Sequence, residues 1–321
     1  MVQSAMMPFL ARRTFHLVIA LVLLSLLTFA LLHLAPGGPA QALLGPDQVS
    51  LEQRAAVEAR LGLDKPIHTQ LWVWGKAVLS GDLGNSYFYR QPALTVVMSR
   101  LPATLILGGL AGAVAIAVGL PAGIAAAYRP GGWLDRLTRS AGVLLITVPS
   151  FWLGILLIYF FSVQAGWFPS SGTGRSDPDA WMPNVRNLIL PALTMALPTA
   201  ATFMLYTRNA VVEAMRHDAI RTVRGMGHPE RHVLHIHAFR MAIAPVLMQI
   251  GLYLPHLVEG SIVVESVFSW PGLGQLTMAS VGRRDYPILL TLTILLGVST
   301  IISSTITDVI HARVDPRIDL Q

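Results

Sequence analysis

Cysteine is absent from this 321-residue chain. Without thiols the chain forms no disulfide bond, offers no thiolate to a metal ion and uses no cysteine nucleophile. Charged residues are also scarce, because Asp, Glu, Lys and Arg together make up 12% of the sequence, against about 25% in a typical soluble domain. The scarcity of charge excludes an ordinary soluble domain and indicates a protein of the lipid bilayer.

Several catalytic motifs are missing as well. The sequence contains no G-x-x-x-x-G-K-[ST] phosphate loop, so the chain lacks that machinery for hydrolysing ATP. It also lacks G-x-S-x-G, H-E-x-x-H and a dinucleotide fingerprint, and no nucleophile–base pair suggests an intramembrane enzyme. Uphill transport by this chain would therefore need energy from a partner protein or from an ion gradient.

Long apolar runs are what the sequence does have. Hydrophobic residues make up 53% of the chain, with a mean hydropathy of +0.58. A helix crossing the roughly 30 Å hydrocarbon core needs about 20 apolar residues. Six runs reach that length: Thr14–Leu34, Ala103–Tyr128, Ser140–Val163, Leu188–Thr207, Ala242–Val264 and Ile288–Ile310. The first is longer than the core of a signal peptide, which favours a retained anchor. We predict an all-α integral membrane protein with six transmembrane helices.

The arginines predict the orientation of these helices. Positive residues in short loops favour the cytoplasmic side. With a cytoplasmic N-terminus, most of the arginines near spans are inside: Arg12, Arg13, Arg129, Arg136, Arg139, Arg208, Arg216, Arg221, Arg224, Arg231, Arg240, Arg313 and Arg317. Fewer lie in the short outside loops: Arg175, Arg186, Arg283 and Arg284. Both termini are therefore expected in the cytoplasm. The arginines form no single basic face, so the pI of 10.1 does not indicate a nucleic-acid partner.

The predicted organisation has three parts. Residues 1–34 form a cytoplasmic N-terminus and the first span, and residues 35–102 form an extracytoplasmic segment. Residues 103–321 form a core of five spans that includes a cytoplasmic loop over 208–241. Within the second part, Leu51–Leu61 has a helical pattern, and Trp72 and Trp74 suit a membrane–water boundary.

The segment Asp218–Pro245 is basic and rich in histidine, and it lies between two apolar runs. Met215, Ala219, Val223 and Met226 recur at helical spacing and predict one apolar stripe. Gly225 and Gly227 end that helix, and Pro229 suits the first turn of another. A short helix, a glycine break and a second helix would give a soluble partner a rigid surface to bind.

Five histidines lie in or near this segment: His217, His228, His232, His235 and His237. The spacing of His228, His232 and His235 would let three imidazoles share one helix face, which is one arrangement for zinc or nickel. The alternative is a solvated basic loop. No cysteine or acidic residue completes a ligand set, so we predict no metal site.

The fifth apolar run carries polar side chains. Gln249, His256 and Glu259 are spaced so that they fall near one stripe of a helix, and Pro255 predicts a kink. Polar groups facing lipid are unfavourable, so this stripe should face protein or water. It either lines a substrate path or forms hydrogen bonds between helices.

At these residues the chain resembles a known family, the B-type permease subunit of the dipeptide/oligopeptide/nickel importers, which are ATP-binding-cassette (ABC) transporters of type I. The resemblance covers nearly the whole length. Its landmarks are GLDKPIHTQLWVWGKAVLSGDLGNS (Gly62–Ser86), SRLPATLILG (Ser99–Gly108), Asp218–Gly227, HAFRMAIAP (His237–Pro245), ESVFSWPGLG (Glu265–Gly274), RRDYP (Arg283–Pro287), and Asp308 with Asp315–Ile318.

This resemblance implies a type I permease fold and a coupling loop that binds an ATPase. The loop residues that it marks are Asp218, Ala219, Arg221, Thr222, Arg224 and Gly227. Arg221, Thr222 and Val223 stand where the general signature has Glu-Ala-Ala, as in RTA-type versions of the peptide branch. Gly227 keeps the signature glycine.

The implied complex contains a homologous second permease, two ABC ATPases and an extracytoplasmic binding protein in a bacterial or archaeal plasma membrane. ATP and Mg²⁺ would bind the ATPases, with no cofactor in this chain. Di- or oligopeptides are the first expectation for cargo, with nickel, glutathione and sugars as alternatives. From the residues alone, an ion-coupled secondary carrier stays open, although the chain lacks the repeated broken helices of that class.

Overall fold

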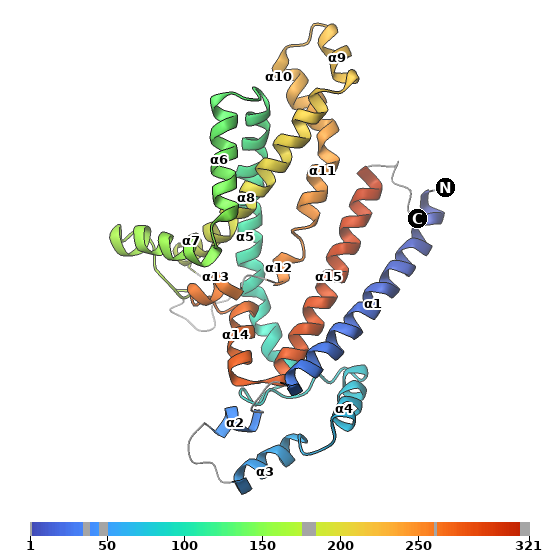
Figure 1. Cartoon of the computed structure of the whole chain (residues 1–321), viewed down its shortest axis with the longest axis vertical. Helices are drawn as coiled ribbons and strands as arrows, with labels where there is room; N and C mark the ends of the chain where they lie inside the picture. The colour runs from blue at the N-terminus through green and yellow to red at the C-terminus, as the bar shows by residue number, and fades with distance from the viewer. Residues whose placement is uncertain (1, 35–38, 45–50, 175–183, 260–261, 315–321) are drawn as a thin grey trace. The chain divides into compact units, whose positions relative to one another are not determined.

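The computed structural model describes residues 2–34, 39–44, 51–174, 184–259 and 262–314 (Figure 1). Helices dominate, and within these ranges the β-pairing consists of one isolated bridge between Asn85 and Pro92. The chain divides into two compact units. The terminal unit holds Met1–Thr104 with Pro271–Ile301, and the central unit holds Leu105–Trp270 with Ile302–Gln321.

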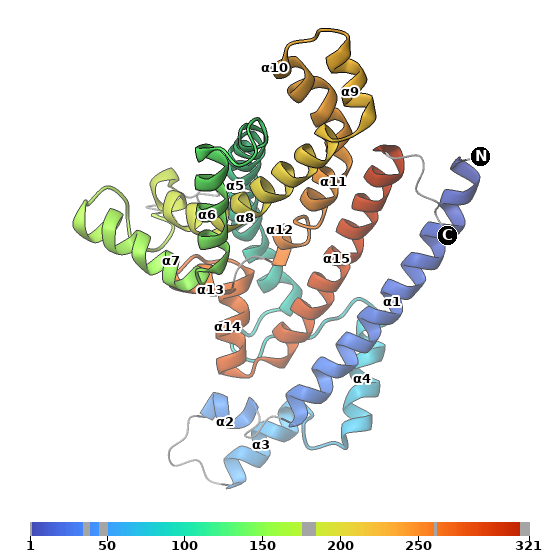
Figure 2. The same cartoon turned by 45° about the horizontal axis from the view of Figure 1, so that its top comes forward.

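Helices α1 to α4 and α14 belong to the terminal unit. Their bounds are α1 Val2–Leu34, α2 Pro39–Leu44, α3 Leu51–Leu61, α4 Ile67–Leu79 and α14 Leu273–Arg283. Helix α3 has the bounds that its pattern predicted. Helix α4 lies beside the C-terminal end of α1 (Figure 2), where the rings of Phe29 and Trp74 are 5.8 Å apart and His33 Nε2 lies 2.9 Å from Gln70 Oε1.

Two long helices run through both units: α5 is Ala93–Ala127 and α15 is Tyr286–Val314. The other helices of the central unit are α6 Trp133–Thr147, α7 Ser150–Leu157, α8 Val185–Met215, α9 Asp218–Gly225, α10 Glu230–His232, α11 Phe239–Gly251, α12 His256–Glu259 and α13 Ile262–Val267. Two π-helices complete the unit, η1 Ile158–Gln164 and η2 Val233–Ala238.

Helices long and apolar enough to cross a bilayer confirm the membrane class. Among the described residues they are Phe15–Leu34, Ala93–Ala127, Val185–Met215, Glu230–Val258 and Tyr286–Ile310. Much of α1 is exposed, with side chains such as Leu23, Leu27 and Leu31 uncovered. Apolar side chains uncovered along a helix of this length are expected to meet lipid.

The third predicted span differs from the structure. Instead of one continuous helix over Ser140–Val163, helix α6 and the pair α7–η1 meet at an angle of 104°. The break falls at Val148–Pro149, because proline restricts the preceding residue to extended angles, and Val148 has φ −70° and ψ 126°. Within the described ranges, five helices are thus candidate spans, or six when the bent pair is counted as one.

The fifth predicted span also has different limits. Helical structure runs from Glu230 through α10, η2 and α11, so the apolar stretch is Glu230–Val258 rather than Ala242–Val264. The helix is interrupted over Leu252–Pro255 before α12 begins. This interruption confirms the break that Pro255 predicted.

Helices α5 and α8 pack closely because glycines face the contact. A Cβ atom at Gly119 would lie 2.6 Å from the carbonyl oxygen of Ala200, and one at Gly123 would lie 2.5 Å from that of Met204. Small residues of this kind allow helix backbones to approach each other in membranes. The contact leaves no room for a side chain at either glycine.

A buried ion pair joins α6 to α8. Arg208 Nε and Nη2 each donate to the Asp135 carboxylate at 2.8 Å, and the Gly131 amide donates to the same group at 2.7 Å. Asp135 is fully buried, and removing one member of such a pair leaves an uncompensated charge. The pair therefore fixes the end of α8 that leads towards α9.

Candidate functional site

Helix α9 is separated from α8 by a sharp turn. Helix α8 ends at Met215, and the Nδ1 atom of His217 accepts a hydrogen bond from the Ala219 amide at 3.3 Å. This is an N-cap contact, which satisfies one of the free amides at a helix start. At the other end Gly227 has φ +84°, a left-handed conformation that favours glycine. Gly227 therefore ends the segment as predicted, whereas Gly225 is still the last residue of α9, and α9 forms a separate short helix.

One side chain anchors α9 to the rest of the central unit. Ile220 is 1% exposed and belongs to a buried cluster with Val211, Val233, Leu234 and Ala238. These residues come from α8 and η2. An eight-residue helix is too short to be stable by itself, so this apolar contact holds α9 in place.

An ion pair joins α9 to α10, which lie side by side in Figure 1. Arg224 Nη2 donates to Glu230 Oε1 at 2.6 Å, and Arg224 Nε donates to Glu230 Oε2 at 3.2 Å. The bond to Glu230 raises the pKa of Arg224. Arg224 is thus engaged within the loop, so its guanidinium is held at a fixed place on this surface.

The prediction that Met215, Ala219, Val223 and Met226 form one apolar stripe on one helix is wrong. Met215 belongs to α8, Ala219 and Met226 are exposed, and Val223 is half-buried. The chain turns at Arg216 and His217, which shifts the helical register and directs Ile220 inward instead. Consequently Met226, at 70% exposure, adds an apolar side chain to the free surface.

The predicted coupling residues gather on and around α9. Asp218, Ala219, Arg221 and Thr222 are all exposed. Arg221 Nη1 lies 3.4 Å from Asp218 Oδ1, and Thr222 Oγ1 donates to the carbonyl of Asp218 at 3.2 Å. The result is a compact surface of mixed charge with an apolar edge. Such a surface suits a protein partner better than a small ligand.

Three histidine rings meet beside this surface, but they are not the predicted three. The ring centroids of His228 and His232 are 5.0 Å apart, and His237 lies 6.0 Å and 5.4 Å from them. His235 Nδ1 instead contacts the Arg231 carbonyl at 2.9 Å. The π-helix η2 causes the change, because it brings residues five apart onto one face. In the described residues, no group of three His, Cys, Asp or Glu has metal-binding geometry.

The predicted polar stripe of the fifth span is only partly brought together. Gln249 on α11 and His256 on α12 line a cavity of about 270 Å³, although the turn between them breaks the helix. Glu259 ends α12, and its side chain lies outside the described residues. Sequence reasoning missed Thr199 and Thr202 of α8, which line the same cavity. Thr202 follows Pro198 by four residues and donates to its carbonyl, whereas Thr199 donates to the carbonyl of Met195, so the sequence offers little signal for either.

The terminal unit has a second polar centre that the sequence did not reveal. Asp285 is 1% exposed and accepts hydrogen bonds from the Ser86 hydroxyl and from the amides of Tyr87 and Phe88, the last two at 3.2 Å. Burial, and then the charge of Asp285, raises the pKa of Tyr87. This carboxylate fixes the Ser86–Phe88 turn against the start of α15.

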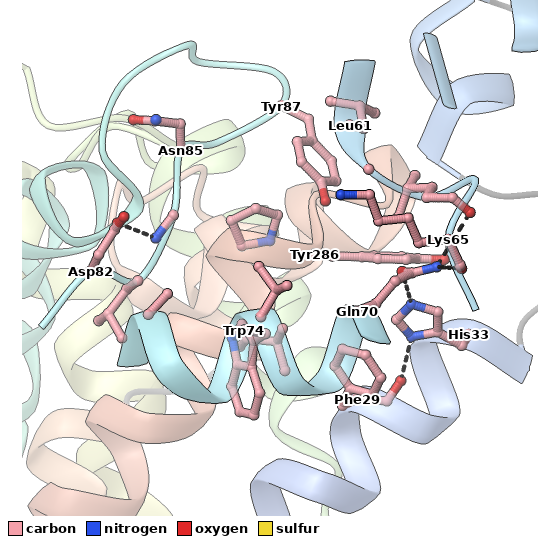
Figure 3. Close-up of a pocket in the computed structure, with 18 residues that line it drawn as sticks. Phe29, His33, Leu61, Lys65, Gln70, Trp74, Asp82, Asn85, Tyr87 and Tyr286 are labelled. Carbon is pink, nitrogen blue, oxygen red and sulfur yellow. Dashed lines mark hydrogen bonds between the residues drawn. The ribbon is translucent and has the colours of Figure 1, made fainter. Parts of the chain in front are cut away.

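A cavity of about 270 Å³ adjoins that turn. Figure 3 shows aromatic rings around it, from Phe29, Trp74, Tyr87 and Tyr286. Three polar side chains of its wall are paired with one another or with backbone, since His33 contacts Gln70 and the Phe29 carbonyl, and the Tyr286 hydroxyl donates to the Leu32 carbonyl. The wall therefore acts as a packed junction between α1, α4 and α15.

Comparison with known proteins identifies the class. A family model described as "Binding-protein-dependent transport system inner membrane component" matches residues 119–320, and the N-terminal model of the same system matches residues 6–108. The chain belongs to this family. It is therefore the multi-pass inner-membrane permease component of an ABC importer, which confirms the resemblance read from the sequence.

Relatives cover the permease from end to end. The glutathione transport system permease protein GsiC of Salmonella typhimurium is 37% identical over 313 residues, which is 98% of this chain and 99% of the relative. The oligopeptide transport system permease protein AppB of Bacillus subtilis is 33% identical over 316 residues, 98% and 100% of the two chains. A putative peptide transport system permease protein of Brucella abortus is 37% identical over 315 residues, 98% and 99%.

A solved structure supports the fold. A chain of the inward-facing MetNI methionine ABC transporter matches the permease with a TM-score of 0.56 and 21% identity, over 70% of this chain and 98% of that one. At this identity the match concerns the fold alone. It agrees with the type I importer architecture predicted for the permease.

Proposed function

We propose that this permease forms half of the translocation pathway of an ATP-driven importer of short peptides. The observation that carries the proposal is the exposed α9 surface, anchored through Ile220 on a chain of this transport family. Relatives named for oligopeptide and glutathione transport support the cargo class, since glutathione is itself a tripeptide. Nickel and sugar are less favoured cargoes. The family match also argues against an ion-coupled carrier.

Helix α9 is the element that a partner ATPase binds. Asp218, Arg221 and Thr222 would contact the ATPase directly, with the small side chain of Ala219 allowing close approach. Arg224 and Gly227 would hold the loop in shape, through the Glu230 contact and the left-handed turn. ATP and Mg²⁺ would bind the ATPases, so this chain is a non-catalytic subunit without a cofactor.

The complete importer contains further subunits. A homologous second permease would supply the other half of the pathway, two ATPases would bind the two coupling loops, and an extracytoplasmic binding protein would deliver the peptide. Closing of the ATPases on ATP would move both α9 helices together and change which side of the pathway is open. Each subunit is inferred from the class of transporter.

The cavity lined by Gln249 and His256 is the proposed cargo path within this chain. Gln249, His256, Thr199 and Thr202 offer both donors and acceptors of hydrogen bonds, which suit peptide groups without selecting a side chain. Glu259, one turn beyond His256, would add a negative charge that disfavours acidic cargo. Removing that charge should therefore change the preference among charged peptides.

Reconstitution in vesicles tests the proposal. The complete importer should take up a tripeptide only with ATP, and the permease alone should take up none, since energy enters through the partner. A Glu259→Gln arm should raise uptake of acidic relative to neutral peptides by about fivefold, the factor for about 1 kcal/mol of charge interaction. Uptake by the permease alone would refute the importer assignment, and unchanged charge preference would remove Glu259 from the path.

A further inference from the structure

Some arginines of the permease lie where the charge rule disfavours them. Arg283 and Arg284 lie at the C-terminal end of α14, in the short segment between spans that the predicted orientation places outside the cell, and Arg100 lies in the first turns of the span Ala93–Ala127. Lys and Arg near the outer ends of spans oppose the preferred orientation. Their presence there calls for a physical role other than setting the topology.

Two of these arginines line one cavity. Arg100 of α5 and Arg283 of α14 border a space of about 260 Å³, together with Tyr89, Gln275, Leu276 and Ala279. We call this cavity the arginine pocket. Gln275, Ala279 and Arg283 are spaced four residues apart, so they share one face of α14. None of the six lining residues is acidic.

The frame of the arginine pocket is fixed by contacts within the terminal unit. The Leu273 amide at the start of α14 donates to Thr104 Oγ1 of α5 at 2.8 Å. The Arg283 guanidinium carbon lies 3.6 Å from the ring centroid of Phe88, and the Phe88 amide is held by Asp285. The nearby carboxylate of Asp285 is thus buried and bonded to the Ser86–Phe88 turn.

The donors of the arginine pocket match an oxyanion. Arg283 Nη1 donates to the Tyr89 hydroxyl oxygen at 3.3 Å, so the Tyr89 proton is directed to another acceptor. Guanidinium groups present several N–H donors in a planar fork that fits carboxylate and phosphate. Arg100 and Arg283 border the same small cavity, so an anion bound there would lie near two positively charged residues.

We propose that the arginine pocket binds the carboxylate of the peptide cargo as it enters the permease. The inference rests on the proposed function, because every short peptide with a free C-terminus carries this group. The cavity is close to the lower end of ligand pockets, about 300 Å³, which suits one carboxyl-bearing residue. Leu276 gives its wall a buried apolar part, and Gln275 adds an amide.

The test compares trialanine with trialanine amide in the complete importer, reconstituted in phosphatidylcholine vesicles. Arg100→Gln should raise the KM for trialanine about tenfold, which corresponds to about 1.4 kcal/mol. The KM for the amide should change less than about twofold, because the amide has no anion to lose a contact. The same binding protein serves every arm, so its own preference cancels in the variant-to-wild-type ratio.

Matched variants keep the result interpretable. Arg90→Gln removes an exposed arginine outside the pocket and should leave both KM values unchanged. Arg100→Lys keeps the positive charge but loses the planar guanidinium group, so its KM for trialanine should lie between those of the wild type and Arg100→Gln. Arg283→Gln should act like Arg100→Gln; because it also loosens the Phe88 contact, Arg100→Gln carries the decision.

Several outcomes overturn the inference. Equal KM changes for trialanine and its amide, or no change at all, would show that the pocket does not bind the carboxylate. Neither result would contradict the proposed ATP-driven uptake. The same comparison is repeated in vesicles of anionic phosphatidylglycerol. A KM change seen only in those vesicles would assign the pocket to a lipid phosphate instead of the peptide carboxylate. A wild-type importer that takes up no trialanine with ATP contradicts the proposed function, and the inference falls with it.

Discussion

Replacing Ile220 with alanine lowers ATP-driven uptake by at least about thirtyfold, because losing such a buried side chain removes about 2–5 kcal/mol of packing. Ile220 is the fully buried residue of α9, and the eight-residue helix has little stability of its own. Without that anchor α9 leaves its position on α8 and η2. ATP hydrolysis by the partners then no longer moves the permease.

The measurement is uptake of a peptide by reconstituted importer, with ATP hydrolysis followed in the same vesicles. Ile236→Ala is the matched control, since Ile236 is 50% exposed in η2 and close in sequence. It should keep uptake within about twofold, because exposed substitutions change stability little. Equal losses from the two variants would show that the buried contact of α9 is unimportant.

Replacing Gly123 with leucine abolishes the folded permease. A Cβ atom there would lie 2.5 Å from the Met204 carbonyl oxygen and 2.8 Å from Thr207 Cβ, and neither backbone can yield without separating α5 from α8. Even Gly123→Ala should destabilise by about 1–3 kcal/mol through overpacking. The readout is the yield of monodisperse protein after extraction, and its thermal midpoint.

Gly109 is the control on the same helix, because a Cβ atom built there meets no atom within 4 Å. Gly109→Ala should match or slightly exceed the wild-type thermal midpoint, since alanine favours helix over glycine by about 1 kcal/mol. A Gly123→Ala midpoint equal to that of Gly109→Ala would contradict the close packing of α5 and α8.

Local chemistry explains what could be predicted from sequence. Hydropathy over windows of about 20 residues finds the spans, because a helix satisfies its own backbone hydrogen bonds and an apolar one is therefore stable in the hydrocarbon core. The stop at Gly227 follows from its left-handed conformation, and the break at Pro255 from the missing amide. The helix Leu51–Leu61 needs only its own periodicity. Each of these features depends on residues that are neighbours in the sequence.

Other features depend on register or on distant residues. The π-helix brings His237 to His232 in place of His235, and nothing in the periodicity of the segment signals the change. The turn at His217 directs Ile220 inward rather than Ala219. Asp285 meets the Ser86 turn across most of the chain length. Such contacts follow from packing, which a one-dimensional pattern does not contain.

One cross-linking measurement tests the central claim that a partner ATPase binds α9. Because the chain has no cysteine, Thr222→Cys provides a single thiol on the exposed face of α9. A photoreactive benzophenone attached there before assembly should cross-link the permease to the ATPase, whereas the same probe on Ile306→Cys, an exposed position within α15, should not. The claim is contradicted if the probe at 222 gives no ATPase adduct in an importer that still takes up peptide.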